Sequence, residues 1–175
     1  MSRLDHLWAG WRQAYLEGTG EDGRRADSLD IPEGGSLFSA VEQSGLPDDE
    51  SFVLHRGVTA FAMLNIYPYT SGHTMVMPKR PVGSLADLTN DEYAELWSMV
   101  RDAVAAIEAA YGPGGINVGL NQGRAAGAGI PEHIHVHCVA RWSGDTNFMT
   151  ATAGARVLPE ALVESWSKLR EHWPA

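Results

Sequence analysis

The chain of 175 residues has little cysteine, few basic side chains and no long apolar run. Cys138 is its one cysteine, which excludes a disulfide within the chain, and we interpret it as a small buried apolar residue. The 13 Lys and Arg residues stand against 22 Asp and Glu, and this net charge of -9 argues against nucleic-acid or membrane partners. No run is long enough to span a bilayer, and Asp5 and His6 interrupt the start where a signal peptide needs its apolar core. We therefore expect a cytoplasmic protein.

The apolar content of 44% is enough for a single domain over residues 1–175, with a mobile loop at about 17–35, where Gly and charged residues dominate. In the long helix expected at 90–111, Asn90 is the expected N-cap and Tyr93 lies on the apolar stripe. In the last helix, expected at 159–173, Val163 lies on the apolar side. The pattern predicts an α+β fold, an antiparallel sheet with packed helices. Residue periodicity and turn signals place strands at 51–56, 59–65, 73–77, 116–121 and 133–139, and helices at 4–16, 36–42, 90–111 and 159–173.

The stretch with the most chemical information is 133–139, which reads His-Ile-His-Val-His-Cys-Val. Side chains on a strand alternate between two faces, so the three histidines are expected on one face and the apolar residues on the other. This alternation predicts a buried apolar face and an opposite face that presents three imidazoles in a row. A row of imidazoles indicates a functional site, because imidazole titrates near neutral pH and can act as nucleophile, acid, base or metal ligand.

The central histidine, His135, is the natural nucleophile of this row. A neutral imidazole can attack phosphorus and form a covalent phosphoramidate, which divides one difficult transfer into two easier ones. His133 and His137 lie roughly 6.5 Å to either side along the strand and are expected to position the ring and the phosphate. The competing chemistry is metal binding, in which His55 or His73 completes a ligand set, although no Cys-x-x-Cys accompanies the histidines.

A glycine-rich loop over residues 121–129 leads into the histidines. Its sequence, Asn-Gln-Gly-Arg-Ala-Ala-Gly-Ala-Gly, contains no bulky apolar side chain. Glycine lets backbone N–H groups approach a ligand closely, and consecutive N–H groups can form an anion-binding concavity. The loop is either a phosphate-binding element or a plain flexible hairpin, and its position before three histidines favours phosphate binding.

The alternation of histidine with apolar residues resembles the motif that names the histidine-triad (HIT) family of nucleotide hydrolases and transferases. The wider match covers about residues 52–149, and two further blocks resemble those of the family. Segments near both ends are most similar to the bacterial diadenosine tetraphosphate phosphorylase branch. The segments that carry the resemblance are 133–139, 64–78 and 118–123 for the family, and 7–12 and 141–149 for the branch.

The resemblance implies that His135 is the nucleophile that becomes nucleotidylated, and that the protein forms a homodimer. It also implies a small-molecule nucleotide substrate, with inorganic phosphate or water as the acceptor. For the remaining site, the resemblance assigns phosphate binding to Asn121, Gln122, Gly127, Gly129, His133 and His137, and nucleoside binding to Leu64, Asn65, Ile66 and His73.

Two positions depart from the pattern of many relatives. Ser36 and Ser39 stand where many relatives carry a zinc-binding Cys-x-x-Cys, and because serine is a poor zinc ligand we expect no structural zinc and no required cofactor. Gly129 and Ile130 stand where other branches place Gln with Ser or Thr, which argues against phosphoramidate hydrolysis. We therefore expect an enzyme acting on a dinucleoside polyphosphate; the alternatives are a phosphoramidate hydrolase, a metal-dependent enzyme and a nucleotide-binding module without catalysis.

Overall fold

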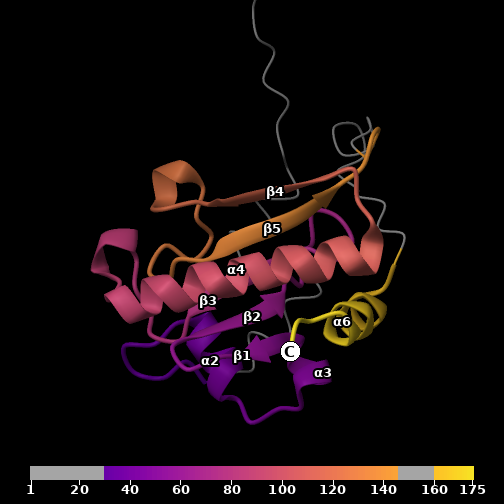
Figure 1. Cartoon of the computed structure of the whole chain (residues 1–175). Coiled ribbons are helices and arrows are strands. Elements are labelled where there is room, and N and C mark those ends of the chain that lie inside the picture. The colour runs from indigo at the N-terminus through magenta and orange to yellow at the C-terminus, as the bar shows by residue number, and fades with distance from the viewer. Residues whose placement is uncertain (1–29, 146–159) are drawn as a thin grey trace, which may run out of the picture.

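The structure is a computed structural model, which describes residues 30–145 and 160–175 (Figure 1). Five strands form one antiparallel sheet in the order β1-β2-β3-β5-β4, and helices pack against it, which confirms the predicted α+β fold. The helix expected at 4–16 and most of the loop expected at 17–35 lie outside the described residues. The strands are β1 Val53–Arg56, β2 Ala60–Leu64, β3 Thr74–Pro78, β4 Gly115–Leu120 and β5 Val136–Arg141. The helices are α2 Leu37–Gln43, α3 Asp48–Ser51, α4 Asn90–Tyr111 and α6 Leu162–Glu171, with short 3-10 turns η2 Leu85–Asp87 and η3 Arg124–Ala126.

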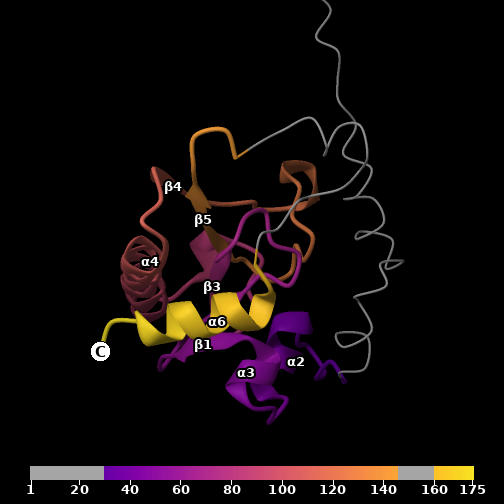
Figure 2. The same cartoon turned by 90° about the vertical axis from the view of Figure 1, so that its right-hand side faces the viewer.

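Helix α4 lies across one face of the sheet, over β2, β3 and β5 (Figures 1 and 2). Its N-cap is Thr89 rather than the predicted Asn90. The Thr89 hydroxyl accepts a hydrogen bond from the backbone N–H of Glu92 at 3.2 Å, and the Glu92 carboxylate accepts one from the Thr89 N–H at 2.8 Å. A cap at Asn90 would have placed Tyr93, which cannot return this bond, at the third helical position, so the reciprocal pair decides the start of the helix.

The core between α4 and the sheet is built mainly from apolar side chains. Tyr93, expected on the buried stripe, is instead 52% exposed, because the contacts with the sheet begin one turn later at Leu96. Small side chains at Ala103 and Ala106 let the helix axis come close to the strands. The residues buried here include Leu64, Val76, Leu96, Val100, Ile107, Val136, Cys138 and Ala140.

A second apolar cluster covers the opposite face, where α2 lies (Figure 2). All five residues of β2 are buried, because its side chains point alternately into the two clusters. Ser36 caps α2, and its hydroxyl accepts a hydrogen bond from the Ser39 N–H at 3.2 Å. The second cluster consists of Phe38, Val53, Phe61, Met63, Met75 and Met77, with Val41 and Ile130 packed against it.

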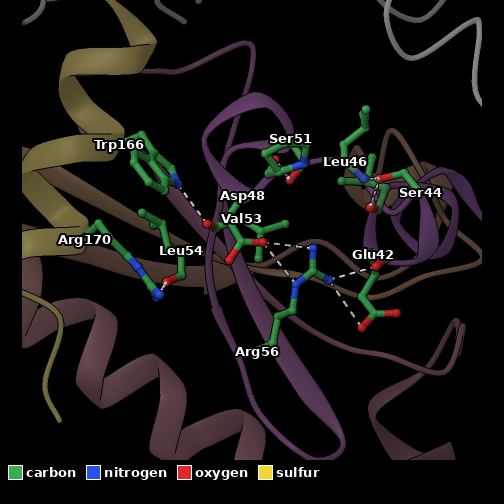
Figure 3. Close-up of polar contacts among 12 residues, drawn as sticks. Glu42, Ser44, Leu46, Asp48, Ser51, Val53, Leu54, Arg56, Trp166 and Arg170 are labelled. Atoms are coloured by element: carbon green, nitrogen blue, oxygen red, sulfur yellow. Dashed lines mark hydrogen bonds and ion pairs between the residues drawn. The ribbon is translucent and has the colours of Figure 1, made fainter.

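The two edges of the sheet differ in their covering. At β1 the Trp166 indole N–H donates to the Val53 carbonyl at 2.8 Å, and the Arg170 guanidinium donates to the Leu54 carbonyl (Figure 3). Strand β4 forms the other edge, its residues are largely exposed, and no strand of residues 30–145 or 160–175 pairs beyond it. None of the described helices is long and apolar enough to cross a membrane.

Helix α6 contacts the rest of the protein through Leu162, Trp166 and Leu169, which are spaced four and three residues apart. Val163, expected on the same side, is 55% exposed. One residue corresponds to about 100° of rotation round a helix, which carries Val163 out of the contact stripe. On the far side of β1, Arg56 forms ion pairs with Glu42 and Asp48 at 3.4 and 3.2 Å (Figure 3).

Candidate active site

The histidine segment enters the sheet later than its alternation predicts. Pairing between β3 and β5 stops at Val76 and Val136, so residues 133–135 precede the strand. There the Ile134 N–H bonds to the Val82 carbonyl at 2.7 Å instead of to β3. The expected exposed row of three imidazoles is therefore wrong: His133 is fully buried and His135 is 6% exposed, because Phe38 of α2 packs its ring against both at centroid distances of 5.5 and 5.0 Å.

His133 has both ring nitrogens occupied within the protein. Its Nε2 lies 2.7 Å from the Pro78 carbonyl, which can only accept, so Nε2 carries the proton. Its Nδ1 lies 2.6 Å from the Ser36 Oγ and accepts that hydroxyl proton. Burial lowers the pKa of His133, which keeps the ring neutral. No nitrogen of His133 is left for the phosphate contact assigned to it from the resemblance.

His135 presents the free lone pair that a nucleophile needs. Its Nδ1 lies 2.9 Å from the His133 carbonyl, so Nδ1 donates its proton there and Nε2 is unprotonated in the neutral ring. Burial lowers the pKa of His135, which favours this neutral form at physiological pH. Within the described part of the chain, Nε2 of His135 has no hydrogen-bond partner.

A fourth histidine, His73, joins the cluster. The backbone N–H of Tyr69 donates to His73 Nδ1 at 3.0 Å, so the proton of neutral His73 is on Nε2 and is donated to His137 Nδ1 at 2.9 Å. Neutral His137 consequently carries its own proton on Nε2. The rings of His135 and His137 are 4.9 Å apart. The structure thus places His73 behind His137, where it fixes a tautomer, and beside Asn65, the other polar residue assigned to the nucleoside.

The residues assigned to the nucleoside divide between the two faces of the sheet. Leu64 is buried in the core beneath α4, on the opposite side from the histidines, which contradicts a contact with a base. Asn65 lies beside the cluster: its backbone N–H bonds to the His73 carbonyl at 2.9 Å, and its side-chain oxygen accepts from the Tyr67 N–H at 2.9 Å. Ile66 follows it and is half-buried.

The glycine-rich loop uses some of its polar groups in hydrogen bonds within the protein, which leaves fewer of them for an anion. The Gly127 N–H bonds to the Arg124 carbonyl at 2.9 Å. This N–H is therefore occupied, contrary to the predicted phosphate contact of Gly127. The Gln122 side-chain oxygen accepts from the Leu85 N–H at 3.0 Å, which ties the loop to η2. Asn121 and Gly129 are half-buried, and the Asn121 amide has no hydrogen-bond partner among the described residues. Asn121 is therefore a better candidate for a ligand contact than Gln122.

The metal alternative finds no support in this geometry. His55 is stacked on Trp173 at a ring distance of 5.7 Å, at the β1 edge, and does not join the triad. Among the residues that the structure describes, no group of three or more His, Cys, Asp or Glu side chains could hold a metal ion.

Three residues of the site escaped the sequence prediction. In the sequence, Ser36 stands out only as a serine in place of a zinc-binding cysteine, and nothing assigns Phe38 or Tyr69 to the site. Each contacts a histidine that is distant in the sequence: Ser36 contacts His133, 97 positions away, Phe38 contacts His135, and Tyr69 stacks on His137. The sequence carries no periodic signal for such contacts.

Known proteins resemble this chain in sequence and in fold. The HIT domain profile matches residues 47–144. AP-4-A phosphorylase of Mycobacterium tuberculosis is 40% identical over 171 residues, which cover 98% of this chain and 85% of that protein. Bis(5'-nucleosyl)-tetraphosphatase (asymmetrical) of Schizosaccharomyces pombe is 36% identical over 95 residues, covering 54% of this chain and 52% of that protein. A Zn-bound histidine triad family protein from Mycobacterium smegmatis superposes with a TM-score of 0.63 at 27% identity, covering 78% of this chain and 91% of that one.

Proposed function

The chain belongs to the HIT domain family, and from that premise we propose that it is an enzyme that moves a nucleotidyl group from a dinucleoside polyphosphate to inorganic phosphate, through a covalent nucleotidyl-His135. The observation that carries the proposal is the state of His135, whose Nδ1 proton is held by the His133 carbonyl while Nε2 keeps its lone pair. The choice of substrate and acceptor is supported by the 40% identity with AP-4-A phosphorylase.

In the first step, Nε2 of His135 attacks the phosphorus next to one nucleoside. A P–N bond forms, and the P–O bond to the rest of the polyphosphate breaks, with its electron pair leaving on oxygen. The attacking ring becomes cationic, and its Nδ1–H bond to the His133 carbonyl, 2.9 Å long, stabilises that charge. The Nε2–H of His137 and the amide of Asn121 are the donors we assign to the phosphate oxygens.

In the second step, an oxygen of inorganic phosphate attacks the same phosphorus. The new P–O bond forms as the P–N bond breaks, and His135 regains its lone pair. With diadenosine tetraphosphate the first step releases ATP and the second releases ADP. Asn65 and Ile66 are the residues that we assign to the nucleoside, because they follow β2 at the edge of the histidine cluster.

Product analysis tests the proposal. We expect wild-type protein to convert diadenosine tetraphosphate to ADP and ATP only when phosphate is present, and mass spectrometry to detect adenylylated His135 when phosphate is absent. His135→Asn should lower turnover by about a thousandfold or more, because no other group supplies the nucleophile. His172→Asn, which alters an exposed histidine, is the matched control. AMP and ATP without phosphate would make water the acceptor, and no turnover would overturn the substrate class.

We further propose that two copies pair through β4. Its residues are exposed, and Val118 is 44% exposed at an edge that carries no further described strand. Light scattering should then give twice the 19.0 kDa of one chain. Val118→Arg places a charge at this edge and should give the single-chain mass, whereas Val58→Arg, at the exposed β1–β2 turn, should not. A single-chain mass for the wild type would contradict the proposal.

A further inference from the structure

We propose that Ser36 is a positioning residue for the nucleophile and acts on His135 through His133. The inference rests on the proposed function for its catalytic readout. The segment 133–135 lies outside the β3–β5 ladder and so lacks the ladder bonds that hold the rest of the strand.

Two backbone bonds outside the ladder and one buried side chain hold the segment here. The Ile134 N–H bonds to the Val82 carbonyl at 2.7 Å, and the weaker His133 N–H bond to the Ile130 carbonyl is 3.3 Å long. The His133 ring supplies the remaining anchor, since it is bonded at one nitrogen to Pro78 and at the other to Ser36. The position of the His133 backbone, including its carbonyl, therefore depends on this ring.

That carbonyl is the group that orients the nucleophile. It accepts the Nδ1 proton of His135 at 2.9 Å, and so determines both the tautomer and the angle of the attacking ring. A displacement of the His133 ring moves the carbonyl with it. Because attack on phosphorus requires close alignment, a shift of about 1 Å can cost a hundredfold in rate.

Ser36 is built into the fold as a donor to His133. Its Oγ accepts from the Ser39 N–H at 3.2 Å, which leaves the hydroxyl proton for His133 Nδ1, 2.6 Å away. Ser36 and His133 are both buried, so no solvent replaces a lost hydroxyl. Without this donor, Nδ1 is an unpaired buried acceptor, and the ring keeps only the bond to the Pro78 carbonyl out of the two bonds that fix its angle.

Helix α2 thus contributes twice to the same site. Ser36 holds His133, and two residues later Phe38 packs against the rings of both His133 and His135. The helix is fixed in turn through Glu42, which pairs with Arg56 at 3.4 Å and with Lys79 at 3.5 Å (Figure 3 shows the Arg56 pair). Its place on the sheet is therefore set independently of the histidines.

The test uses three variants of the full chain. Ser36→Gly removes the hydroxyl and introduces glycine, which is tolerated at a helix N-cap. Ser39→Ala removes a second buried hydroxyl from the same helix, one that lies 3.4 Å from the Ser36 Oγ but does not bond to His133. It keeps the Ser39 N–H that donates to Ser36, and it is the matched control. Ser36→Thr keeps a hydroxyl donor at the same position and is the rescue variant. Thermal unfolding confirms that each variant is folded at the assay temperature.

Two readouts decide the outcome. We expect Ser36→Gly to lower kcat for phosphorolysis by about tenfold or more with KM within twofold, while Ser36→Thr and Ser39→Ala stay near wild type. Imidazole 15N NMR without substrate should show the Nδ1–H tautomer of His135 in wild type and a mixture of tautomers in Ser36→Gly. Equal kcat and equal His135 signals in Ser36→Gly and Ser39→Ala would overturn the proposal. If the wild type has no turnover, the proposed function fails, and the NMR comparison still tests the positioning role by itself.

Discussion

The two faces of the segment 135–141 carry different kinds of side chain, apolar on one face and hydrogen-bonded histidines on the other. Toward α4 it presents Val136, Cys138 and Ala140, all fully buried in an apolar core. Toward α2 it presents His135 and His137, whose ring nitrogens take part in directed hydrogen bonds. Alternate residues of one short segment therefore serve two purposes, and the α4 face depends on filled volume while the α2 face depends on where protons lie.

This difference predicts that the two faces fail in different ways. Loss of volume on the α4 face costs folding free energy and leaves the shape of the site intact. Loss of one donor or acceptor on the α2 face leaves the fold nearly unchanged but allows a ring to change its tautomer. Stability measurements and turnover measurements should consequently separate the two faces.

The largest expected effect is on the α4 face. Leu96→Ala empties a fully buried position under the sheet and should lower the free energy of unfolding by about 2–5 kcal/mol. Turnover per folded molecule should remain at the wild-type level. Urea denaturation and steady-state assays measure both quantities, and Val163→Ala, on the exposed side of α6, should stay within about 0.5 kcal/mol. A large fall in turnover in Leu96→Ala would show that the faces are coupled.

A smaller effect is expected on the α2 face from His73. His73→Leu removes the Nε2–H that now bonds to His137 Nδ1 at 2.9 Å, so the proton of His137 is no longer fixed on Nε2. We expect turnover to fall about tenfold to a hundredfold, equivalent to about 1.4–2.8 kcal/mol in the barrier. His73→Gln, whose amide can donate in the same place, should recover part of the activity. Unchanged kcat with a lower Tm in His73→Leu would assign His73 to stability alone.

The smallest effect is the response to pH, and only the α2 face should show it. Burial lowers the pKa of His135 below its ordinary value of 6.5, and the attack requires the unprotonated ring. The acid limb of kcat/KM should therefore have its midpoint below pH 6.5. Burial raises the pKa of Cys138 on the other face to about 12, so this thiol does not titrate in the assay range. A midpoint above pH 6.5 would contradict the burial argument.

The same shift has a consequence for stability. In the unfolded chain the imidazoles of His133 and His135 take up protons near pH 6.5, whereas in the folded protein they do so at lower pH. The unfolded state binds more protons as the pH falls through this range. The free energy of unfolding should accordingly decrease below about pH 6.5, which urea denaturation at several pH values can measure.

The sequence predicted the features that depend on local periodicity. Strict alternation identified the two faces of the histidine segment, and the turn residues gave the order of strands and helices. The prediction was wrong where a contact from elsewhere in the chain decides the outcome. Thr89 displaced Asn90 as the cap because of Glu92, and the segment 133–135 left the ladder where the Val82 carbonyl replaced a partner in β3.

The chemistry of the site was predicted only in part, and for a similar reason. The resemblance placed His135 among three histidines, but the positions of the protons depend on acceptors such as the Pro78 carbonyl and donors such as the Ser36 hydroxyl. These groups lie far away in the sequence and belong to residue types that are common in turns and caps. Only the folded arrangement shows that they meet.

The unequal edges of the sheet govern how far any assembly can grow. Trp166 and Arg170 occupy carbonyls of β1, so a strand arriving there would have to displace both donors (Figure 3). Two chains joined edge to edge through β4 would expose only these sealed ends to a third. Under the proposed pairing through β4, association by strand pairing would therefore stop at two chains and would not continue into a filament.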